Sequence, residues 1–534
     1  MRTLFLILLW SLVGAVHAKP PNIVLILADD MGFSDVGCYG GEIATPNLDK
    51  LAAKGLRFSQ FYNAARCCPT RAALLTGLYP HRAGVGHMLR PMHPPSYTAG
   101  LGANTATLAE LLRPAGYRNY HAGKWHVGGV GRKSGVNHPM NRGFHRAYGT
   151  AGGGNYFGLK RLFLDREPVQ AGDGYYATDA FSDWAVKFLD EHAKEHSTQP
   201  FFLHLCYTAP HFPLHAKPED IAKYRGKYRA GWDALRIARF KRQQKLGLFP
   251  KGTKLSARDS VAEAWAKIPE KQKDEWDLRM AVHAAMIDCM DQGIGRVMKK
   301  VQRMGIWDNT LFLFLSDNGA SAEALDTWPN PSRGHKPGSV TGTRESHRCI
   351  EVGWSNASNT PFREHKMWVH EGGSATPLIA HWPKGIRARG QWTDAVGHVI
   401  DFAPTFLELA GIKYPMQRKD VPLLPLAGQS LVPTFQGKGL NPRTLAWEHE
   451  GNRAIRAGNW KLVATLRGEW ELFNLAEDRT ETRNLASAHS DKVRELSAQW
   501  QRWADRVGVV PWEKLPVPDY TQTKRYRKKS EPFD

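Results

Sequence analysis

Short apolar segments alternate with amphipathic segments over roughly the first four-fifths of the chain, and this order constrains the fold more than any other feature. Residues 22–28 (NIVLILA) form a run rich in Ile, Val and Leu, which is typical of a central parallel strand. Similar runs cover residues 201–207 and 310–316. Apolar side chains at helical spacing precede them, over residues 181–189 and roughly 277–304. The alternation indicates an α/β fold with a mostly parallel sheet and helices on both faces.

The sequence changes character near residue 415, and a smaller C-terminal α+β domain is predicted beyond it. Residues 413–427 are rich in Pro and Leu and have the composition of a loop. Residues 454–475 have the pattern of a strand meander, and residues 490–507 that of an amphipathic helix. We therefore divide the chain into a signal peptide (1–18), a main domain (19–415), a C-terminal α+β subdomain (416–515) and a basic tail (516–534).

The first eighteen residues have the organisation of a secretory signal peptide. Arg2 supplies the positive charge, residues 4–13 the apolar core, and Val16-His17-Ala18 a cleavage site of the A-x-A type. The apolar run is shorter than a membrane span requires, and no later segment is long enough. We therefore expect an exported protein, periplasmic or secreted, with no membrane span after signal removal; a retained N-terminal anchor is the alternative.

The formal net charge of +21 favours polyanionic partners, such as nucleic acid, anionic lipid or sulfated polysaccharide. Part of the excess lies in the run at residues 524–529, which is typical of a solvated tail. Because no nucleic-acid-binding motif accompanies the charge, we expect no nucleic-acid partner.

Polar side chains follow three of the predicted strands. Asp29-Asp30 follows the first, Pro210-His211 the second and Asp317-Asn318 the third. Ligands of parallel sheets bind beyond the carboxyl ends of the strands, and adjacent carboxylates are costly unless a cation lies between them. The hard oxygens of these Asp and Asn side chains therefore predict a Ca²⁺ or Mg²⁺ site, with helix capping as the alternative.

A second candidate site is the segment at residues 67–77 (CCPTRAALLTG). A helix predicted over residues 70–75 would place Cys67 at its N-terminus, where unpaired N–H groups and the helix dipole favour a thiolate. A buried structural cysteine pair is the alternative. The six cysteines match no common zinc pattern, and one or two disulfides remain open.

These motifs resemble those of a known enzyme family. The pattern C-x-P-x-R followed by L-x-T-G at residues 67–77 resembles the signature of the formylglycine-dependent type I sulfatases. Residues 116–126 (GYRNYHAGKWH) are similar to a second sulfatase element, G-Y-x5-G-K-x-H. The arylsulfatase-like bacterial branch is the nearest resemblance. Further sulfatase-like stretches follow in family order, namely Asp29–Gly32, Thr45–Asp49, Thr208–His211, Asp317–Gly319, Lys366 and Glu371–Gly373.

The resemblance implies an alkaline-phosphatase-like fold and a sulfatase catalytic domain over residues 19–415. It implies that a separate maturation enzyme oxidises Cys67 to formylglycine, the nucleophile. It further implies that Ca²⁺ is held by residue 67 together with Asp29, Asp30, Asp317 and Asn318.

Roles for the remaining site residues also follow from the resemblance. His211 would donate a proton to the leaving alcohol, and His126 would take the proton of the remaining hydroxyl on residue 67. Lys124 and Lys366 would hold the sulfate oxygens, while Arg71 would fix the hydrated aldehyde and balance the carboxylates.

Two other functions remain open on the residues alone. One is a phosphodiesterase or phosphonate monoester hydrolase on the same scaffold, and the other is a non-catalytic binder of sulfated glycans. For the sulfatase, a sulfated polysaccharide fragment is preferred over a small aryl or steroid sulfate, and loops 89–102 and 328–359 are candidates for substrate selection. Five histidines have no assigned role: His81, His87, His121, His283 and His370.

Overall fold

The central strand β1 (Asn22–Asp29) pairs in parallel with β7 (Phe201–Pro210) on one side and β8 (Thr310–Ser316) on the other. The computed structural model describes residues 19–89, 91–92, 94–128, 135–324 and 336–516. The predicted signal peptide and residues 517–534 of the predicted basic tail lie outside these ranges. All residues of β1 are buried, which agrees with its continuous apolar sequence.

Within the described residues, an 11-stranded sheet has the order β10-β2-β9-β8-β1-β7-β3-β4-β5-β6, with β11 paired to β2. The pairs from β8 through β1, β7 and β3 to β4 are parallel, while β9 is antiparallel to both β2 and β8. The predicted α/β class with a mostly parallel sheet is therefore confirmed. The other strands are β2 (Leu56–Tyr62), β3 (Arg118–Lys124), β4 (Arg146–Thr150), β5 (Leu162–Leu164), β6 (Glu167–Val169), β9 (Ala375–His381), β10 (Gln391–Thr393) and β11 (Gly397–His398).

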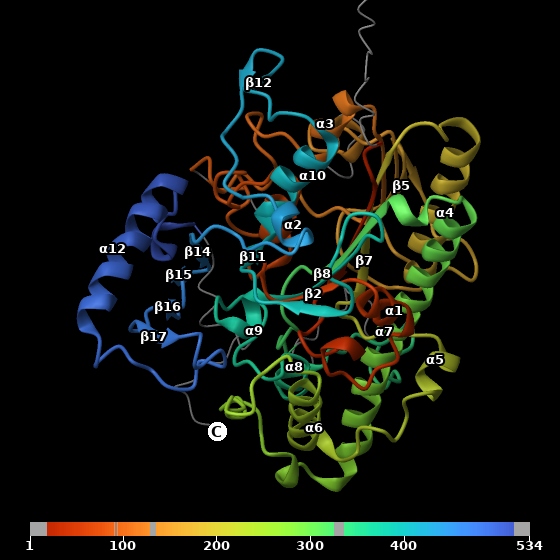
Figure 1. Ribbon diagram of the computed structural model, residues 1–534. Helices are drawn as coiled ribbons and strands as arrows, with labels where there is room; N and C mark the ends of the chain where they lie inside the picture. The colour runs from red at the N-terminus through yellow and green to blue at the C-terminus, as the bar shows by residue number, and fades with distance from the viewer. Residues whose placement is uncertain (1–18, 90, 93, 129–134, 325–335, 517–534) are drawn as a thin grey trace, which may run out of the picture.

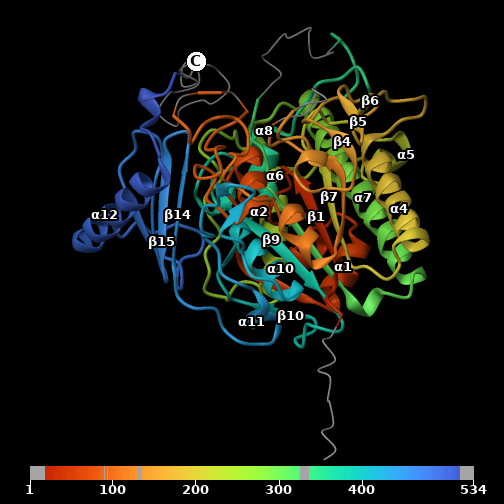
Figure 2. The same cartoon turned by 90° about the horizontal axis from the view of Figure 1, so that it is seen from above.

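Helices cover both faces of this sheet (Figure 2). Helices α4 (Ala177–Glu195) and α7 (Glu270–Arg303) pack on each other and on β7, while α2 (Cys67–Thr76) and α10 (Phe402–Ala410) pack together on the other side. Helix α7 begins at Glu270, earlier than predicted, because its first two turns are polar and carry no apolar stripe. The remaining helices are α1 (Pro46–Ala53), α3 (Leu108–Leu112), α5 (Pro218–Ala222), α6 (Gly231–Lys245), α8 (Glu351–Ser358), α9 (Glu371–Ser374) and α11 (Val432–Phe435).

A smaller C-terminal domain lies beside the main domain (Figure 1). It contains a four-stranded antiparallel sheet and helix α12 (Ser490–Val507), which packs on that sheet. The predicted meander and helix are confirmed, and the structure adds a first strand, β14, that was not predicted. The sheet comprises β14 (Thr444–His449), β15 (Asn452–Ala457), β16 (Trp460–Ala464) and β17 (Glu471–Asn474); β12 (Gln417–Arg418) and β13 (Val421–Pro422) form a separate hairpin.

A buried charge cluster joins the two domains. Glu371, the first residue of α9, accepts hydrogen bonds from Lys461 Nζ of β16 at 2.8 Å and from Tyr62 Oη at 3.0 Å. Arg479 also contacts this carboxylate at 2.9 Å, and Glu481 lies 2.9 Å from Lys461 Nζ. Burial alone would raise the pKa of Glu371, but Lys461 and Arg479 overcome it and lower the pKa to about 2.

All six cysteines lie within the described residues. No disulfide forms among the described residues, and all six cysteines are buried. No helix in the described ranges combines the length and apolarity that crossing a membrane would require.

The charge cluster predicts a pH-dependent effect of Glu371→Gln. The folded pKa of about 2 lies below the unfolded value of about 4.3, so the carboxylate stabilises the fold fully above the unfolded pKa and less as pH falls toward the folded one. We expect the variant to be less stable than wild type at pH 6, and the difference to shrink by about 1.4 kcal/mol per pH unit below about pH 4.3. Urea unfolding at several pH values measures this. Glu495→Gln, at a half-exposed side chain, is the control; an equal, pH-independent loss for Glu371→Gln would contradict the prediction.

Candidate active site

Three parallel strands bring their polar ends to one edge of the main sheet. The register pairs Asp29 with Pro210 and Ala28 with Ser316, so Asp30, His211 and Asp317 follow directly on adjacent strands. Lys124 is the last residue of β3, the next strand beyond β7. The sequence prediction that these strand ends meet is therefore confirmed.

Helix α2 begins at Cys67, and all of its residues are buried. Gly77 ends the helix in the left-handed conformation, with φ of 69°, and donates its N–H to the Ala73 carbonyl at 2.8 Å. A hydrogen bond from Cys68 lowers the pKa of the Cys67 thiol well below its usual value; burial opposes this shift, and Lys124 and His126 add to it. Cys67 thus occupies the helix N-terminus, as predicted, in surroundings that favour an anionic nucleophile.

Arg71 lies one turn along α2 and connects it to two strands. Its Nε donates to Asp317 Oδ2 at 2.9 Å, and its NH1 donates to the Lys124 carbonyl oxygen at 2.9 Å. Its NH2 atom lies 2.8 Å from the same Asp317 oxygen as an ion pair. Arg71 and Asp317 are fully buried. The guanidinium therefore fixes the start of α2 relative to the ends of β3 and β8.

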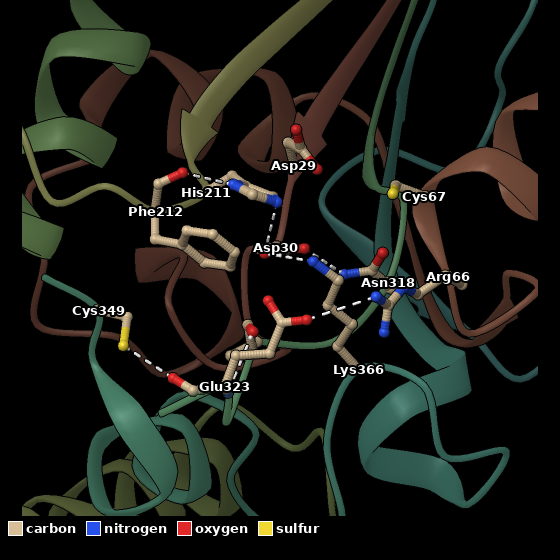
Figure 3. A network of polar contacts seen from close by, with 12 residues as sticks. Asp29, Asp30, Arg66, Cys67, His211, Phe212, Asn318, Glu323, Cys349 and Lys366 are labelled. Carbon is tan, nitrogen blue, oxygen red and sulfur yellow. Dashed lines mark hydrogen bonds and ion pairs between the residues drawn. The ribbon is translucent and has the colours of Figure 1, made fainter. Parts of the chain in front are cut away.

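Each of the two adjacent aspartates has its own lysine. Lys124 Nζ lies 2.6 Å from Asp29 Oδ2, and Lys366 Nζ lies 2.8 Å from Asp30 Oδ2. Burial would raise the pKa of Asp29, but Lys124, His211 and Arg71 lower it to about 2. Asp30 also accepts a hydrogen bond from Asn318 Nδ2 at 2.7 Å (Figure 3).

The site has oxygen atoms suited to a hard divalent cation. Asp29 Oδ1 and Asn318 Oδ1 are buried and have no hydrogen-bond partner among the described residues. Such acceptors are costly to bury, and carboxylate and amide oxygens are the donors that Ca²⁺ prefers. Burial and the neighbouring Asp29 raise the pKa of Asp317 well above its usual value. The residues Asp29, Asp30, Asp317 and Asn318 therefore fit such an ion.

Two histidines flank this group. His126 follows β3 with φ of 56°, and its ring lies within 4.8 Å of the Cys67 and Cys68 thiols. Burial and the Lys124 charge lower the pKa of His126 to about 4, so its ring is neutral at pH 7. His211 donates from Nδ1 to the Phe212 carbonyl oxygen at 2.6 Å, which leaves Nε2 directed at Asp30 Oδ2, 3.5 Å away (Figure 3).

The structure thus gathers every predicted site residue at one edge of the sheet and adds some that the sequence did not reveal. Arg66 occupies the position before α2, next to Cys67, and pairs with Glu323 at 3.4 Å, and both side chains are buried (Figure 3). Two glycines lie beside the site histidines. A Cβ atom added at Gly152 would lie 3.7 Å from the His126 ring, and a Cβ atom added at Gly153 would lie 3.5 Å from His211 Nδ1. Among Arg66, Glu323, Gly152 and Gly153, only Arg66 could have been suspected from the sequence, because it directly precedes Cys67.

The fold and the site together define a hydrolase of anionic esters on an α/β scaffold, and comparisons with known proteins define the family. Residues 21–412 match the family model described as Sulfatase, and residues 363–504 match the one described as N-sulphoglucosamine sulphohydrolase, C-terminal. An arylsulfatase of Klebsiella aerogenes is 34% identical, covering 79% of this chain and 94% of the relative. An N-acetylgalactosamine-6-sulfatase of Mus musculus is 29% identical, covering 90% and 80%.

A solved structure of similar fold agrees with these relatives. Ps i-CgsB, in complex with k-i-k-neocarrahexaose, is 27% identical with a TM-score of 0.65, covering 91% of this chain and 93% of its own. The chain belongs to the sulfatase family and is a sulfuric ester hydrolase.

The Arg71–Asp317 pair predicts strong energetic coupling within the site. Arg71→Met alone leaves a buried carboxylate uncompensated and should cost about 3–5 kcal/mol of stability, whereas adding Asp317→Asn should recover part of that loss. A double-mutant cycle of urea unfolding measures the coupling. The exposed pair Arg494–Asp491, changed in the same way, is the control, and its coupling should lie below about 1 kcal/mol. Additive effects of the two buried substitutions would contradict the prediction.

Proposed function

We propose that this sulfatase releases sulfate from a carbohydrate ester, using formylglycine at position 67 and a bound Ca²⁺ ion. One observation carries the proposal. Helix α2 begins at Cys67, and this end of the helix lies at the same edge of the sheet as the oxygen atoms of Asp29, Asp30, Asp317 and Asn318. Membership of the sulfatase family supports the modification of Cys67 by a separate maturation enzyme.

Residue 67 and the cation supply the chemistry that unmodified side chains lack. Hydrated formylglycine supplies a hydroxyl nucleophile at position 67, and Ca²⁺ supplies positive charge for the sulfate oxygens when bound. Asp29, Asp30, Asp317 and Asn318 would hold the ion through carboxylate and amide oxygens. The buried acceptors Asp29 Oδ1 and Asn318 Oδ1 support this assignment.

Lys124 and Lys366 would bind the sulfate group of the substrate. Burial favours the neutral amine, but Asp29 raises the pKa of Lys124, and Asp30 raises that of Lys366. Both ammonium groups are therefore charged at neutral pH and directed at the edge where Cys67 lies. They would neutralise charge that builds up on the sulfate oxygens as the ester bond breaks.

The two histidines would move protons in opposite directions. Because Nδ1 of His211 donates to the Phe212 carbonyl, its Nε2 is the atom that would carry a proton to the leaving alcohol oxygen. His126 has a pKa of about 4 and is neutral at pH 7, so it can accept a proton from the hydroxyl on residue 67. Arg71 would orient residue 67 from one helical turn away.

The proposed substrate is a sulfate ester of a carbohydrate, and the proposed location is outside the cytoplasm. The N-acetylgalactosamine-6-sulfatase relative and the neocarrahexaose complex of Ps i-CgsB support a saccharide. The net charge of +21 suits a polyanionic sulfated chain. The signal-peptide pattern of residues 1–18 supports a periplasmic or secreted protein, which would meet such a polymer outside the cytoplasm.

Modification and activity should both depend on Cys67. Trypsin cleaves after Arg66 and Arg71, so mass spectrometry of peptide 67–71 reports directly on this residue. We expect formylglycine in protein made with a maturation enzyme, and a fall of about 10³-fold or more in sulfate release from an aryl sulfate in Cys67→Ala. Cys289→Ala, at another buried cysteine, is the matched control. Formylglycine without sulfate release, but with cleavage of the matching phosphate diester, would support the phosphoesterase alternative instead.

Calcium should stabilise the folded protein through the same oxygens. For an ion that binds only the folded state, about 100 times Kd of free Ca²⁺ adds about 2.7 kcal/mol of stability. We expect the thermal midpoint and activity of chelator-treated protein to rise with Ca²⁺, and both responses to weaken strongly in Asn318→Leu. Asp491→Asn, at an exposed aspartate, should respond like wild type. An equal Ca²⁺ response in Asn318→Leu would contradict the ligand assignment.

A further inference from the structure

A second cluster of metal-binding side chains lies where the small domain contacts the main domain. His87 belongs to the segment that follows α2, His449 is the last residue of β14, and Glu450 begins the turn to β15. Their exposed fractions are 3%, 0% and 8%. Neither the sequence motifs nor the proposed reaction assigns a role to this cluster.

The spacing within the cluster suits a shared ion better than direct hydrogen bonds. His87 Nδ1 lies 3.5 Å from Glu450 Oε1, and His449 Nε2 lies 3.6 Å from the same oxygen. One ligand atom from each residue lies within 4.8 Å of the others. These separations exceed ordinary N–H···O distances, but ligands that bind one tetrahedral ion at about 2.0–2.1 Å lie about 3.3 Å apart.

His449 provides independent evidence for a ligand. Both of its ring nitrogens are buried, and neither has a hydrogen-bond partner among the residues that the structure describes. Burying a polar group without a partner costs about 1–3 kcal/mol, so native proteins rarely leave one in this state. A metal bound at Nε2 would remove this cost for the nitrogen that points toward Glu450.

We propose that His87, His449 and Glu450 bind a divalent transition-metal ion of the Zn²⁺ class, separate from the proposed catalytic calcium. Two imidazoles and one carboxylate form a known three-ligand zinc set, with a fourth position for water. Imidazole ligands favour such ions over Ca²⁺, which prefers oxygen. The Trp512 ring packs edge-on against His87, with centroids 4.9 Å apart, and encloses the cluster.

The ion would connect the domain junction to the nucleophile. It would hold the β14–β15 turn of the small domain against the segment that contains His87. The next residue, Met88, places its sulfur 3.6 Å from Cys68 Sγ and 4.0 Å from Cys67 Sγ. Metal binding at the cluster would therefore fix a side chain that packs on the start of α2.

The test is metal binding by the full chain after treatment with a chelator. We expect one equivalent of Zn²⁺ by elemental analysis, in protein whose calcium is measured separately. Co²⁺ in its place should give visible absorption bands without thiolate-to-metal charge transfer. These measurements use the Cys67→Ala protein as the parent, because Cys67, Cys68 and His126 form another group of potential metal ligands that this substitution disrupts. The absence of thiolate bands also separates the cluster from the buried group of His121, His204 and Cys206.

Substitutions locate the ion. His449→Gln and Glu450→Gln should each lower Zn²⁺ affinity at least about tenfold and abolish the rise in thermal midpoint that Zn²⁺ gives. His381→Gln, at a buried histidine that ends β9, is the matched control and should bind like its parent. If one of these variants does not fold, Zn²⁺ binding by the other still locates the ion.

Two results would overturn the proposal. One is a parent protein that binds no Zn²⁺ or Co²⁺ beyond the amount bound by His449→Gln. The other is a raised KM for a sulfated saccharide in both variants with unchanged metal content, which would make the cluster a substrate contact. Calcium-dependent sulfate release from an aryl sulfate is measured independently, so either result leaves the proposed reaction intact.

Discussion

Three buried aspartates at one edge of the main sheet impose the strongest constraint on the structure around them. Asp29, Asp30 and Asp317 are no more than 2% exposed, and a buried charge without a partner costs several kcal/mol. Each cation that meets them comes from a different part of the chain: Arg71 from α2, Lys124 from the end of β3 and Lys366 from the loop before α9. The positions of these three segments are therefore fixed by electrostatics as well as by apolar packing.

The same constraint extends to the domain junction through one short segment. Lys366 pairs with Asp30 in the site, and five residues later Glu371 pairs with Lys461 of the small domain. Both contacts are buried, so an ion pair holds this segment at each end. The small domain is thereby connected by charge to the segment that places Lys366 beside Asp30.

The sequence predicted the structure best where a residue's environment depends on residues near it in the sequence. The strands around β1 and helix α12 were predicted because continuous apolar runs and helical spacing are local patterns. The strand-end residues were predicted to meet because parallel strands share a carboxyl edge. By contrast, β14 has no clean alternation, and the antiparallel insertion of β9 between β2 and β8 depends on long-range pairing. The Arg66–Glu323 pair joins residues 257 positions apart, and Glu323 has no local motif.

The charges of the site explain why its own residues do not complete an anion-binding centre. Arg71, Lys124 and Lys366 contribute three positive charges, and Asp29, Asp30 and Asp317 contribute three negative ones, so this group is neutral when fully ionised. Arg66 and Glu323 cancel in the same way. Burial and the neighbouring Asp29 raise the pKa of Asp317 well above its usual value. A neutral group gives a sulfate ester no net electrostatic attraction, whereas a divalent ion on the unpartnered oxygens Asp29 Oδ1 and Asn318 Oδ1 would give the site the excess that an anionic substrate needs.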